Sequence, residues 1–189
     1  GNIFALHGPM GTGKTSLANR GFAKILGRPF FAISLGGLTD SHYLRGHSYT
    51  YEGSKCGRIV EILQEAKCMN PVIYFDELDK VSNTSHGEEI TNFLIHLTDK
   101  SQNEQFTDMY YSGASFDISK AIFIFSYNDP AKINPILRDR LYKIKVDSYN
   151  LADKQVIARD YLLPRILSDY KFKSDSIILS NDVVKYIID

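Results

Sequence analysis

The chain has 189 residues, with 22 Lys and Arg against 22 Asp and Glu, so its formal net charge at pH 7 is zero. This balance gives no overall attraction to nucleic acid or to a membrane surface, so any basic groove must be local. Hydrophobic residues make up 43% of the chain, but their runs have the length of strands, short of the roughly 20 residues of a membrane span. The length suits one well-buried domain, or one domain and part of a second.

The cysteines indicate the cellular compartment, and the two ends of the chain indicate the extent of the polypeptide. Cys56 and Cys68 are the two cysteines and lack C-x-x-C spacing, and the five histidines include no H-E-x-x-H pair. We therefore expect free thiols, not a disulfide or a metal site, in an intracellular, cytoplasmic and reducing compartment. No signal peptide is visible. The chain begins beside its first strand and ends soon after a helical pattern starts at Val183, so we expect a segment of a longer polypeptide.

A phosphate-binding motif comes first in chain order. Residues 8–15 read Gly-Pro-Met-Gly-Thr-Gly-Lys-Thr, the pattern G-x-x-x-x-G-K-[ST], between an apolar run at 3–6 and a helical pattern from 16 onward. A strand, a loop and a helix in this order aim backbone N–H groups at phosphates, with Lys14 on the β- and γ-phosphates and the Thr15 hydroxyl on Mg²⁺. A glycine-rich turn that binds nothing is the alternative, and the Lys-Thr pair in register argues against it. The predicted nucleotide-binding residues are Gly8, Pro9, Met10, Gly11, Thr12, Gly13, Lys14, Thr15 and Ser16.

The next elements extend this pattern into a βαβ unit. The first helix is expected to end near Leu26, before Gly-Arg-Pro at 27–29, and residues 30–34 are predicted to form the second strand. A polar and aromatic stretch at 36–56 follows, which is too long to be an idle connection in a compact domain. The helix predicted after it has apolar residues at helical spacing: Ile59, Val60, Ile62, Leu63 and Ala66.

A second part of a nucleotide site follows this helix. Residues 71–75 form an apolar run without alternation, typical of a central parallel strand, and Asp76 and Glu77 come directly after it. Ligands of such sheets bind at the carboxyl ends of the strands. Asp76 is thus predicted to hold the Mg²⁺ and its water shell, and Glu77 to polarise the attacking water. An acidic helix cap is the alternative, and the phosphate loop makes it the weaker one.

The rest of the chain supplies further helices and strands. An amphipathic helix is predicted at 88–99, and a buried strand at 121–127 ends at Asn128. An alternating strand is predicted at 142–146, and the pattern becomes helical from Leu151.

Alternating strands and helices predict an α/β fold with a parallel sheet in three layers. Together with the phosphate-loop motif, this predicts a P-loop NTPase domain. We expect this large subdomain to span residues 1–150, and residues 151–189 to begin a small helical subdomain.

The order of these motifs resembles that of AAA+ ATPases: a phosphate loop, an Asp-Glu strand end, an Asn after the next core strand and an Arg in Leu-Arg-Asp-Arg-Leu at 137–141. Further stretches closely resemble the ATPase module of Lon proteases, over nearly the whole chain. They are Leu35-Gly36-Gly37-Leu38, Leu44-Arg45-Gly46-His47, Thr50-Tyr51-Glu52-Gly53, Gly57-Arg58-Ile59, Asp76-Glu77-Leu78-Asp79-Lys80, Phe116-Asp117-Ile118-Ser119 and Tyr161-Leu162-Leu163-Pro164.

This resemblance implies an ATP- and Mg²⁺-dependent ATPase that works as a homohexameric ring and feeds protein substrates to a serine–lysine peptidase domain outside this chain. By position, Asn128 resembles the first sensor, with a strand-end cap as the alternative, and Arg140 resembles the arginine finger. Arg138 is the competing candidate for the finger. The second sensor arginine of the family would follow Asp189.

Two stretches depart from the family pattern. The substrate-gripping pore loop of the family pairs an aromatic with an aliphatic residue, whereas this chain has Tyr51 and Glu52. In the stretch that resembles the second pore loop, residues 98–103 are less acidic and lack the family's proline. The aromatics that remain there are Phe106, Tyr110 and Tyr111. The expected substrate contact is therefore Tyr51, with Glu52 beside it, and a solvated turn tyrosine is the alternative.

Three other classes of function are alternatives to a Lon-type ATPase module. A clamp-loader or chaperone-like remodelling ATPase is one alternative, but the balanced charge argues against nucleic acid as the primary partner. A small-molecule kinase would need an arginine-bearing lid, which nothing here resembles. A scaffold that binds nucleotide without hydrolysis is disfavoured by the presence of Glu77, Asn128 and Arg140.

Overall fold

The computed structural model describes residues 2–50, 52–81, 83–173 and 176–188. The chain divides into two compact units, residues 1–146 and 147–189. The sequence analysis placed this boundary after residue 150.

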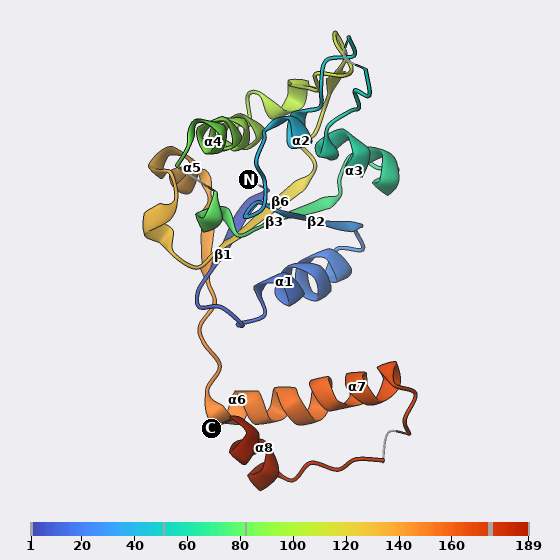
Figure 1. The fold of residues 1–189 in the computed structure, drawn as a ribbon, viewed down its shortest axis with the longest axis vertical. Helices are drawn as coiled ribbons and strands as arrows, with labels where there is room; N and C mark the ends of the chain where they lie inside the picture. The colour runs from blue at the N-terminus through green and yellow to red at the C-terminus, as the bar shows by residue number, and fades with distance from the viewer. Residues whose placement is uncertain (1, 51, 82, 174–175, 189) are drawn as a thin grey trace. The chain divides into compact units, whose positions relative to one another are not determined.

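The first unit is built on a sheet of five parallel strands in the order β2-β3-β6-β1-β7 (Figure 1). The strands are β1 (Ile3–His7), β2 (Phe30–Ser34), β3 (Val72–Asp76), β6 (Ile122–Tyr127) and β7 (Tyr142–Lys145). All six residues of β6 are buried, and in β3 only the last is not, because both strands lie inside the sheet and are covered on both faces.

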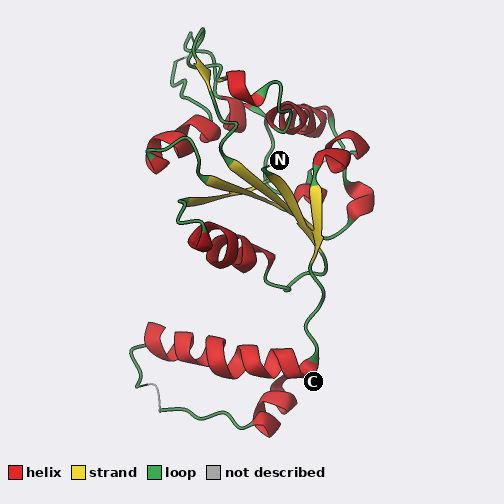
Figure 2. Ribbon diagram, turned by 180° about the vertical axis from the view of Figure 1, so that it is seen from behind, coloured by secondary structure: helices red, strands yellow, loops and turns green. Residues whose placement is uncertain are grey.

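Helices cover both faces of this sheet, which confirms the predicted three-layer α/β architecture (Figures 1 and 2). Within the described residues of this unit, one face carries α1 (Lys14–Ser16) continued by the π-helical turns of η1 (Leu17–Ala23), and the other carries α3 (Arg58–Ala66) and α4 (Ser85–Leu97). The remaining short elements of this unit are α2 (His42–Arg45), η2 (Leu78–Lys80), η3 (Asn103–Gln105), β4 (Phe106–Thr107), β5 (Ser115–Phe116), η4 (Pro130–Lys132) and α5 (Pro135–Arg140).

Two hydrophobic cores correspond to these two faces. The smaller core joins η1 to the sheet, with Ala18 and Ala23 packed against strand residues such as Leu6 and Ile124. The larger core lies under α3 and α4 and includes a stacked pair of rings, Phe75 and Phe125, whose centroids are 4.9 Å apart. The alternation of side chains along each buried strand supplies both cores at once.

Some elements differ from the sequence expectation. The helix predicted at 88–99 begins at Ser85 instead, because the Thr84 side chain caps it by accepting the Gly87 N–H, and it ends at Leu97. The stretch predicted as a loop at 36–56 contains the short helix α2. The antiparallel pair β4-β5 was not predicted, since each strand has only two residues.

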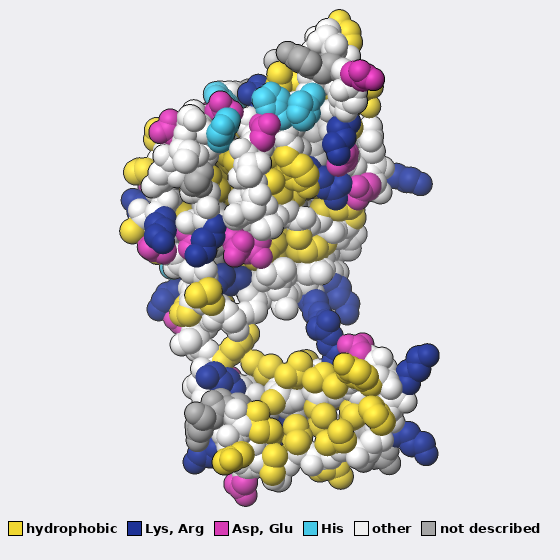
Figure 3. Space-filling view, viewed as in Figure 1, with side chains coloured by type: hydrophobic (Ala, Val, Ile, Leu, Met, Phe, Trp, Pro, Cys, Tyr) yellow, Lys and Arg dark blue, Asp and Glu magenta, His cyan; other side chains and the backbone are white. Residues whose placement is uncertain are grey.

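The second unit is helical, as its periodicity predicts. Helix α6 (Leu151–Val156), the π-helical η5 (Ile157–Leu162) and α7 (Leu163–Asp169) follow one another without a break, and α8 (Asn181–Ile188) ends the unit. Asn150 and Asp153 start it with a reciprocal capping box. Many apolar side chains of this unit are on its surface (Figure 3), including Tyr161 and Tyr186 at 68% and 86% exposure.

Two further expectations can be compared with the structure. Cys56 and Cys68 are free thiols, as their spacing predicts. In the part of the chain that the structure describes, no helix combines the length and the apolar character that crossing a membrane requires.

The contact between α2 and the start of α3 gives a test of the fold. A Cβ at Gly57 would lie 2.2 Å from the Leu44 carbonyl oxygen and 2.6 Å from the Arg45 carbonyl carbon, which are backbone atoms that cannot move aside. We predict that Gly57→Ala lowers the free energy of unfolding in urea by about 1–3 kcal/mol. Gly37→Ala is the control, because no described atom lies within 4 Å of its added Cβ, and it should change stability by about 0.5 kcal/mol or less. Equal losses in the two variants would contradict this packing.

Candidate nucleotide site

The phosphate loop connects β1 to α1, as predicted. Gly13, at the start of α1, has a φ of 78°, a left-handed conformation that glycine adopts without steric cost. The Lys14 ammonium donates to the carbonyl oxygens of Gly8 and Pro9, each at 2.8 Å. It also donates to Asn128 Oδ1 at 2.8 Å, so the loop is tied to the end of β6. The lysine that sequence analysis assigned to phosphate is therefore held inside the loop and beside the predicted sensor.

Asp76 lies at the carboxyl end of β3 and is close to the phosphate loop. The Ser126 hydroxyl and the Tyr74 hydroxyl both donate to Asp76 Oδ1, the latter at 3.3 Å. The Tyr74 hydroxyl is also 3.2 Å from the Thr15 hydroxyl. Thr15 and Asp76, the two predicted Mg²⁺ ligands, therefore share one hydrogen-bonding neighbour. A hydroxyl and a carboxylate are the oxygen donors that Mg²⁺ prefers, so these residues fit the ion.

Glu77 has a strained backbone and an exposed side chain. Its φ of 60° and ψ of 46° place it in the left-handed region, which is uncommon for a residue with a side chain. Its backbone N–H donates to Asp76 Oδ1 at 3.0 Å, and its Oε2 accepts from the Ser34 hydroxyl at 3.4 Å, across the pair β2-β3. Left-handed residues cluster at functional sites, where the surrounding structure holds them. Here the turn directs the carboxylate away from Asp76 and toward β2.

A buried carboxylate, which the sequence analysis did not single out, positions the predicted sensor. Asp79 is 7% exposed, and its Oδ2 accepts the backbone N–H groups of Asn128 at 3.1 Å and of Asp129 at 3.0 Å. These bonds fix the turn after β6, so that the Asn128 side chain faces Lys14. The Asn128 amide contacts the phosphate loop through its oxygen. Its assignment as the first sensor, with a strand-end cap as the alternative, stays a prediction.

Burial affects the charges at the site. It lowers the pKa of Lys14, while the carboxylates of Asp76 and Asp79 oppose that shift by favouring the ammonium. Burial raises the pKa of the Tyr74 hydroxyl, so this group stays neutral and protonated at physiological pH. Tyr74 can therefore donate to Asp76 while it accepts from Thr15.

Arg140 lies far from the phosphate loop of its own chain. It ends α5, two residues before β7, and the first residue of β7, Tyr142, pairs with Phe4 near the start of β1. The phosphate loop follows the other end of β1. Because a parallel pair runs in one direction, Arg140 and the phosphate loop are at opposite ends of the sheet, and this guanidinium does not reach a nucleotide bound by its own chain.

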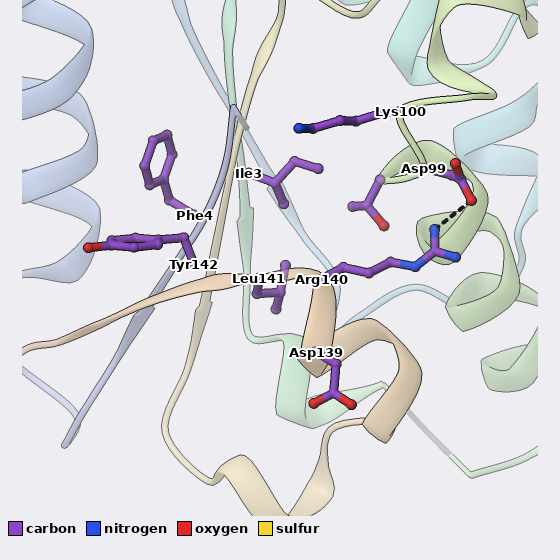
Figure 4. Close-up of a pocket in the computed structure, with 9 residues that line it drawn as sticks. Ile3, Phe4, Asp99, Lys100, Asp139, Arg140, Leu141 and Tyr142 are labelled. Carbon is purple, nitrogen blue, oxygen red and sulfur yellow. Dashed lines mark hydrogen bonds and ion pairs between the residues drawn. The ribbon is translucent and has the colours of Figure 1, made fainter.

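Arg140 is held on one side of an open pocket of about 720 Å³ (Figure 4). Its Nη1 donates to the Ile95 carbonyl oxygen at 2.8 Å and to Asp99 Oδ2 at 3.0 Å, at the end of α4. Residues from the start of β1, the end of α4 and the turn before β7 line the pocket: Ile3, Phe4, Thr98, Asp99, Lys100, Asp139, Arg140, Leu141 and Tyr142. The competing arginine, Arg138, instead donates to the Pro130 carbonyl oxygen at 3.3 Å.

The residues predicted to contact substrate are partly described. Tyr51 lies outside the described residues, and Glu52 is exposed. In the stretch that resembles the second pore loop, Phe106 is 8% exposed and packs edge-on against Phe93 with centroids 6.1 Å apart. Tyr111 accepts a hydrogen bond from Gln64 Nε2 at 3.2 Å. Phe106 is thus a core residue, while the assignment of Tyr51 and Glu52 stays a prediction.

Three side chains that sequence analysis did not assign to the site belong to it: Tyr74, Asp79 and Ser126. Tyr74 stands two residues before Asp76, and alternation puts both on one face of β3. Ser126 is the one hydroxyl besides Tyr127 in the otherwise apolar β6. A polar residue inside a buried strand is the signal that could have identified both, since such a group needs a hydrogen-bonding partner.

The domain has three layers around a parallel sheet, a phosphate loop after β1 and an acidic pair at the end of β3. These features define the class of P-loop nucleoside triphosphatases. Within that class, the family model for the ATPase family associated with various cellular activities (AAA) matches residues 4–148. The chain belongs to the AAA family and is an AAA ATPase module.

Similar proteins are found in a virus and in bacteria. The chain is 43% identical over its whole length to a Lon protease homolog of Acanthamoeba polyphaga mimivirus, and 44% identical to the Lon protease of Helicobacter pylori strain J99. It is 39% identical over its whole length to Lon protease 1 of Bacillus subtilis. The chain spans 18%, 22% and 24% of the length of these relatives. The resemblance to the Lon ATPase module is confirmed, and the rest of those proteins lies outside this chain.

The buried carboxylate of Asp79 can be tested directly. We predict that Asp79→Ala lowers the free energy of unfolding by about 2–5 kcal/mol, because two part-buried N–H groups would each lose a charged acceptor. Asp117 is a matched control, since it also accepts a backbone N–H, that of Ser119 at 2.9 Å, but is exposed. Asp117→Ala should lower the free energy of unfolding by about 1 kcal/mol or less, with both variants measured by urea titration. A similar loss in both variants would contradict the role of Asp79.

Proposed function

We propose that this chain is the ATP-driven motor module of a Lon-type protease, and that it couples ATP hydrolysis to the unfolding and translocation of protein substrates. The observation that supports the catalytic part is the convergence of Lys14, Asp76 and Asn128 at one edge of the sheet. The identity to Lon proteases over the whole chain supports the substrate class.

Each residue of the site has a separate task in this proposal. Lys14 exchanges its carbonyl acceptors for the β- and γ-phosphate oxygens of ATP, and Thr15 and Asp76 hold Mg²⁺. When bound, Mg²⁺ would supply positive charge that offsets the charge developing on the phosphates. Glu77 accepts a proton from the attacking water, for which its exposed carboxylate is suitable. Asn128 donates through its amide to the γ-phosphate or to that water, while its backbone stays on Asp79.

The wider setting is proposed on the same basis. We infer a homohexameric ring in the full-length protein, polypeptide as the translocated substrate, and an intracellular, reducing compartment that suits the free thiols of Cys56 and Cys68. An AAA remodelling ATPase without a peptidase is the second candidate. The chain spans only 18% and 22% of the length of these relatives, so the similarity does not extend to their remaining parts. Degradation of a labelled protein by the full-length form distinguishes the two.

We predict that Lys14→Ala abolishes nucleotide binding, whereas Glu77→Gln keeps it and loses hydrolysis. The reason is that Lys14 provides charge to the phosphates, while Glu77 acts on water alone. Loss of a positioned base should lower the ATP turnover of the full-length protein by roughly 10²–10⁴-fold. Binding of a fluorescent ATP analogue and phosphate release give the two measurements. Lys24→Ala, an exposed lysine outside the loop, is the control and should change neither. Parental turnover in Glu77→Gln would reject this assignment.

Arg140 gives a second test of the proposed function. We expect it to act on the nucleotide of a neighbouring subunit, because it lies at the far end of the sheet from its own phosphate loop. Arg140→Ala should therefore bind ATP nearly normally and lose about 10³–10⁵ in turnover. Mixing Lys14→Ala subunits with Arg140→Ala subunits of the full-length protein should restore part of the activity, since some interfaces then join an intact loop to an intact arginine.

Mixed rings confirmed by native mass spectrometry that show no recovery would contradict action across the interface. Arg138→Ala is the matched control, because it removes an arginine of the same helix that contacts a carbonyl oxygen elsewhere.

A further inference from the structure

A cluster of titratable side chains lies in the segment between β2 and α3, apart from the nucleotide site. It borders a small cavity of about 180 Å³ whose lining is rich in groups that can ligate metal. The lining residues are Asp40, His42, Tyr43, His47, Lys55, Cys56 and Glu61. The nucleotide chemistry described above uses none of them.

Two imidazoles and one carboxylate come together there. One potential ligand atom from each of Asp40, His42 and His47 lies within 4.8 Å of the other two. Asp40 Oδ1 is 2.6 Å from His42 Nδ1, and the rings of His42 and His47 are stacked with centroids 4.9 Å apart. Histidine side chains are seen grouped on the face drawn in Figure 3, over the region of α2.

The backbone that carries these side chains is fixed by hydrogen bonds. Asp40 Oδ1 also accepts the backbone N–H of His42 at 2.8 Å, which sets the start of α2. The Gly46 N–H donates to the His42 carbonyl oxygen at 2.7 Å, and the His47 N–H donates to the Lys55 carbonyl oxygen at 3.1 Å. The three candidate ligands are thus presented from a short, closed stretch of chain, which lowers the entropy cost of bringing them together.

We propose that Asp40, His42 and His47 form a binding site for one divalent transition-metal ion of the zinc type. Imidazole nitrogens suit Zn²⁺, Ni²⁺ and Cu²⁺, and two histidines with one carboxylate are an established Zn²⁺ ligand set. The site is distinct from the Mg²⁺ site at Thr15 and Asp76, whose donors are oxygens alone. It also modifies the expectation from sequence, which considered C-x-x-C and H-E-x-x-H spacing and therefore predicted no metal site at the cysteines or histidines.

The geometry requires only side-chain adjustment on binding. Two donors on one tetrahedral Zn²⁺, each about 2.0–2.2 Å from the ion, are separated by roughly 3.3 Å, so Asp40 and His42 must part slightly. Alternatively, Asp40 keeps its bond to Nδ1 and orients the ring while Nε2 binds the ion, as carboxylates do for many metal-bound histidines. His47 is exposed, so its ring can turn out of the stack.

Calorimetric titration of the 189-residue chain with Zn²⁺, without nucleotide, tests the proposal. The titration uses a Cys56→Ser, Cys68→Ser background to exclude thiol ligands. We expect one Zn²⁺ per chain, and at least about a tenfold loss of affinity in His42→Ala and in His47→Ala. Asp40→Asn, which keeps an acceptor for the His42 amide, should also weaken binding. His86→Ala is the control, because His86 is exposed on α4 outside the cluster, and it should bind as the parent does.

A second measurement needs no substitution in the cluster. In an NMR titration of the same cysteine-free chain, Zn²⁺ should shift the ring signals of His42 and His47 before those of the other three histidines. Unchanged affinity in the His42→Ala and His47→Ala variants, an equal loss in His86→Ala, or first shifts at other histidines would each overturn the proposal. Because no readout depends on ATP, its failure would leave the proposed motor function untouched.

Discussion

Parallel pairing of β1, β3 and β6 is the constraint on which the nucleotide site depends. Each strand contributes one part of the site at its carboxyl end: the phosphate loop after β1, Asp76 at the end of β3 and Asn128 after β6. Since the pairs are in parallel register, these three chain segments meet at one edge of the sheet although they are far apart in sequence. Any slip in register would separate Lys14 from Asn128 and Thr15 from Tyr74.

Buried polar contacts convert this coarse placement into defined geometry. Tyr74 and Ser126 hold Asp76 from within the sheet, and Asp79 holds the backbone after β6. Removing a carboxylate such as that of Asp79 from water costs free energy unless the carboxylate accepts hydrogen bonds. These hydrogen bonds also restrict the conformations that the neighbouring backbone and side chains can adopt. The site is therefore supported by residues that never need to touch ATP. This support explains how the exposed Glu77 can occupy a strained backbone conformation.

Much of this could be predicted from the sequence, for physical reasons that differ between elements. The apolar runs of β3 and β6 and the glycine-lysine loop are strong local signals, so the α/β class and the positions of Lys14 and Asp76 followed directly. The start of α4 was missed because Thr84 caps the helix ahead of its apolar residues. Phe106 lies in the stretch that resembles the second pore loop, and its burial against Phe93 depends on tertiary packing that the sequence pattern does not indicate.

Long-range partners were the part that sequence patterns could not supply. Nothing local indicates that Asp79 reaches the N–H groups of Asn128 and Asp129, or that Asp99 would bind Arg140. The cluster of Asp40, His42 and His47 was not predicted for a related reason. Its spacing matches no metal motif, and the turn between α2 and Lys55 brings the three side chains together. Contacts of this kind depend on the tertiary fold, which the periodicity of apolar residues does not indicate.

The bonds of Arg140 have a consequence for assembly. Arg140 donates to Ile95 and to Asp99 through a single nitrogen, Nη1. Among the described residues, no acceptor is bonded to the other two nitrogens of its guanidinium. A guanidinium has five N–H groups, so the one on Nε and the two on Nη2 remain for a further acceptor. An arginine immobilised in this way before a neighbour arrives loses little side-chain entropy when it meets a phosphate. In the ring that we propose, Arg140 would therefore meet the phosphate of a neighbouring nucleotide with part of its ordering already complete.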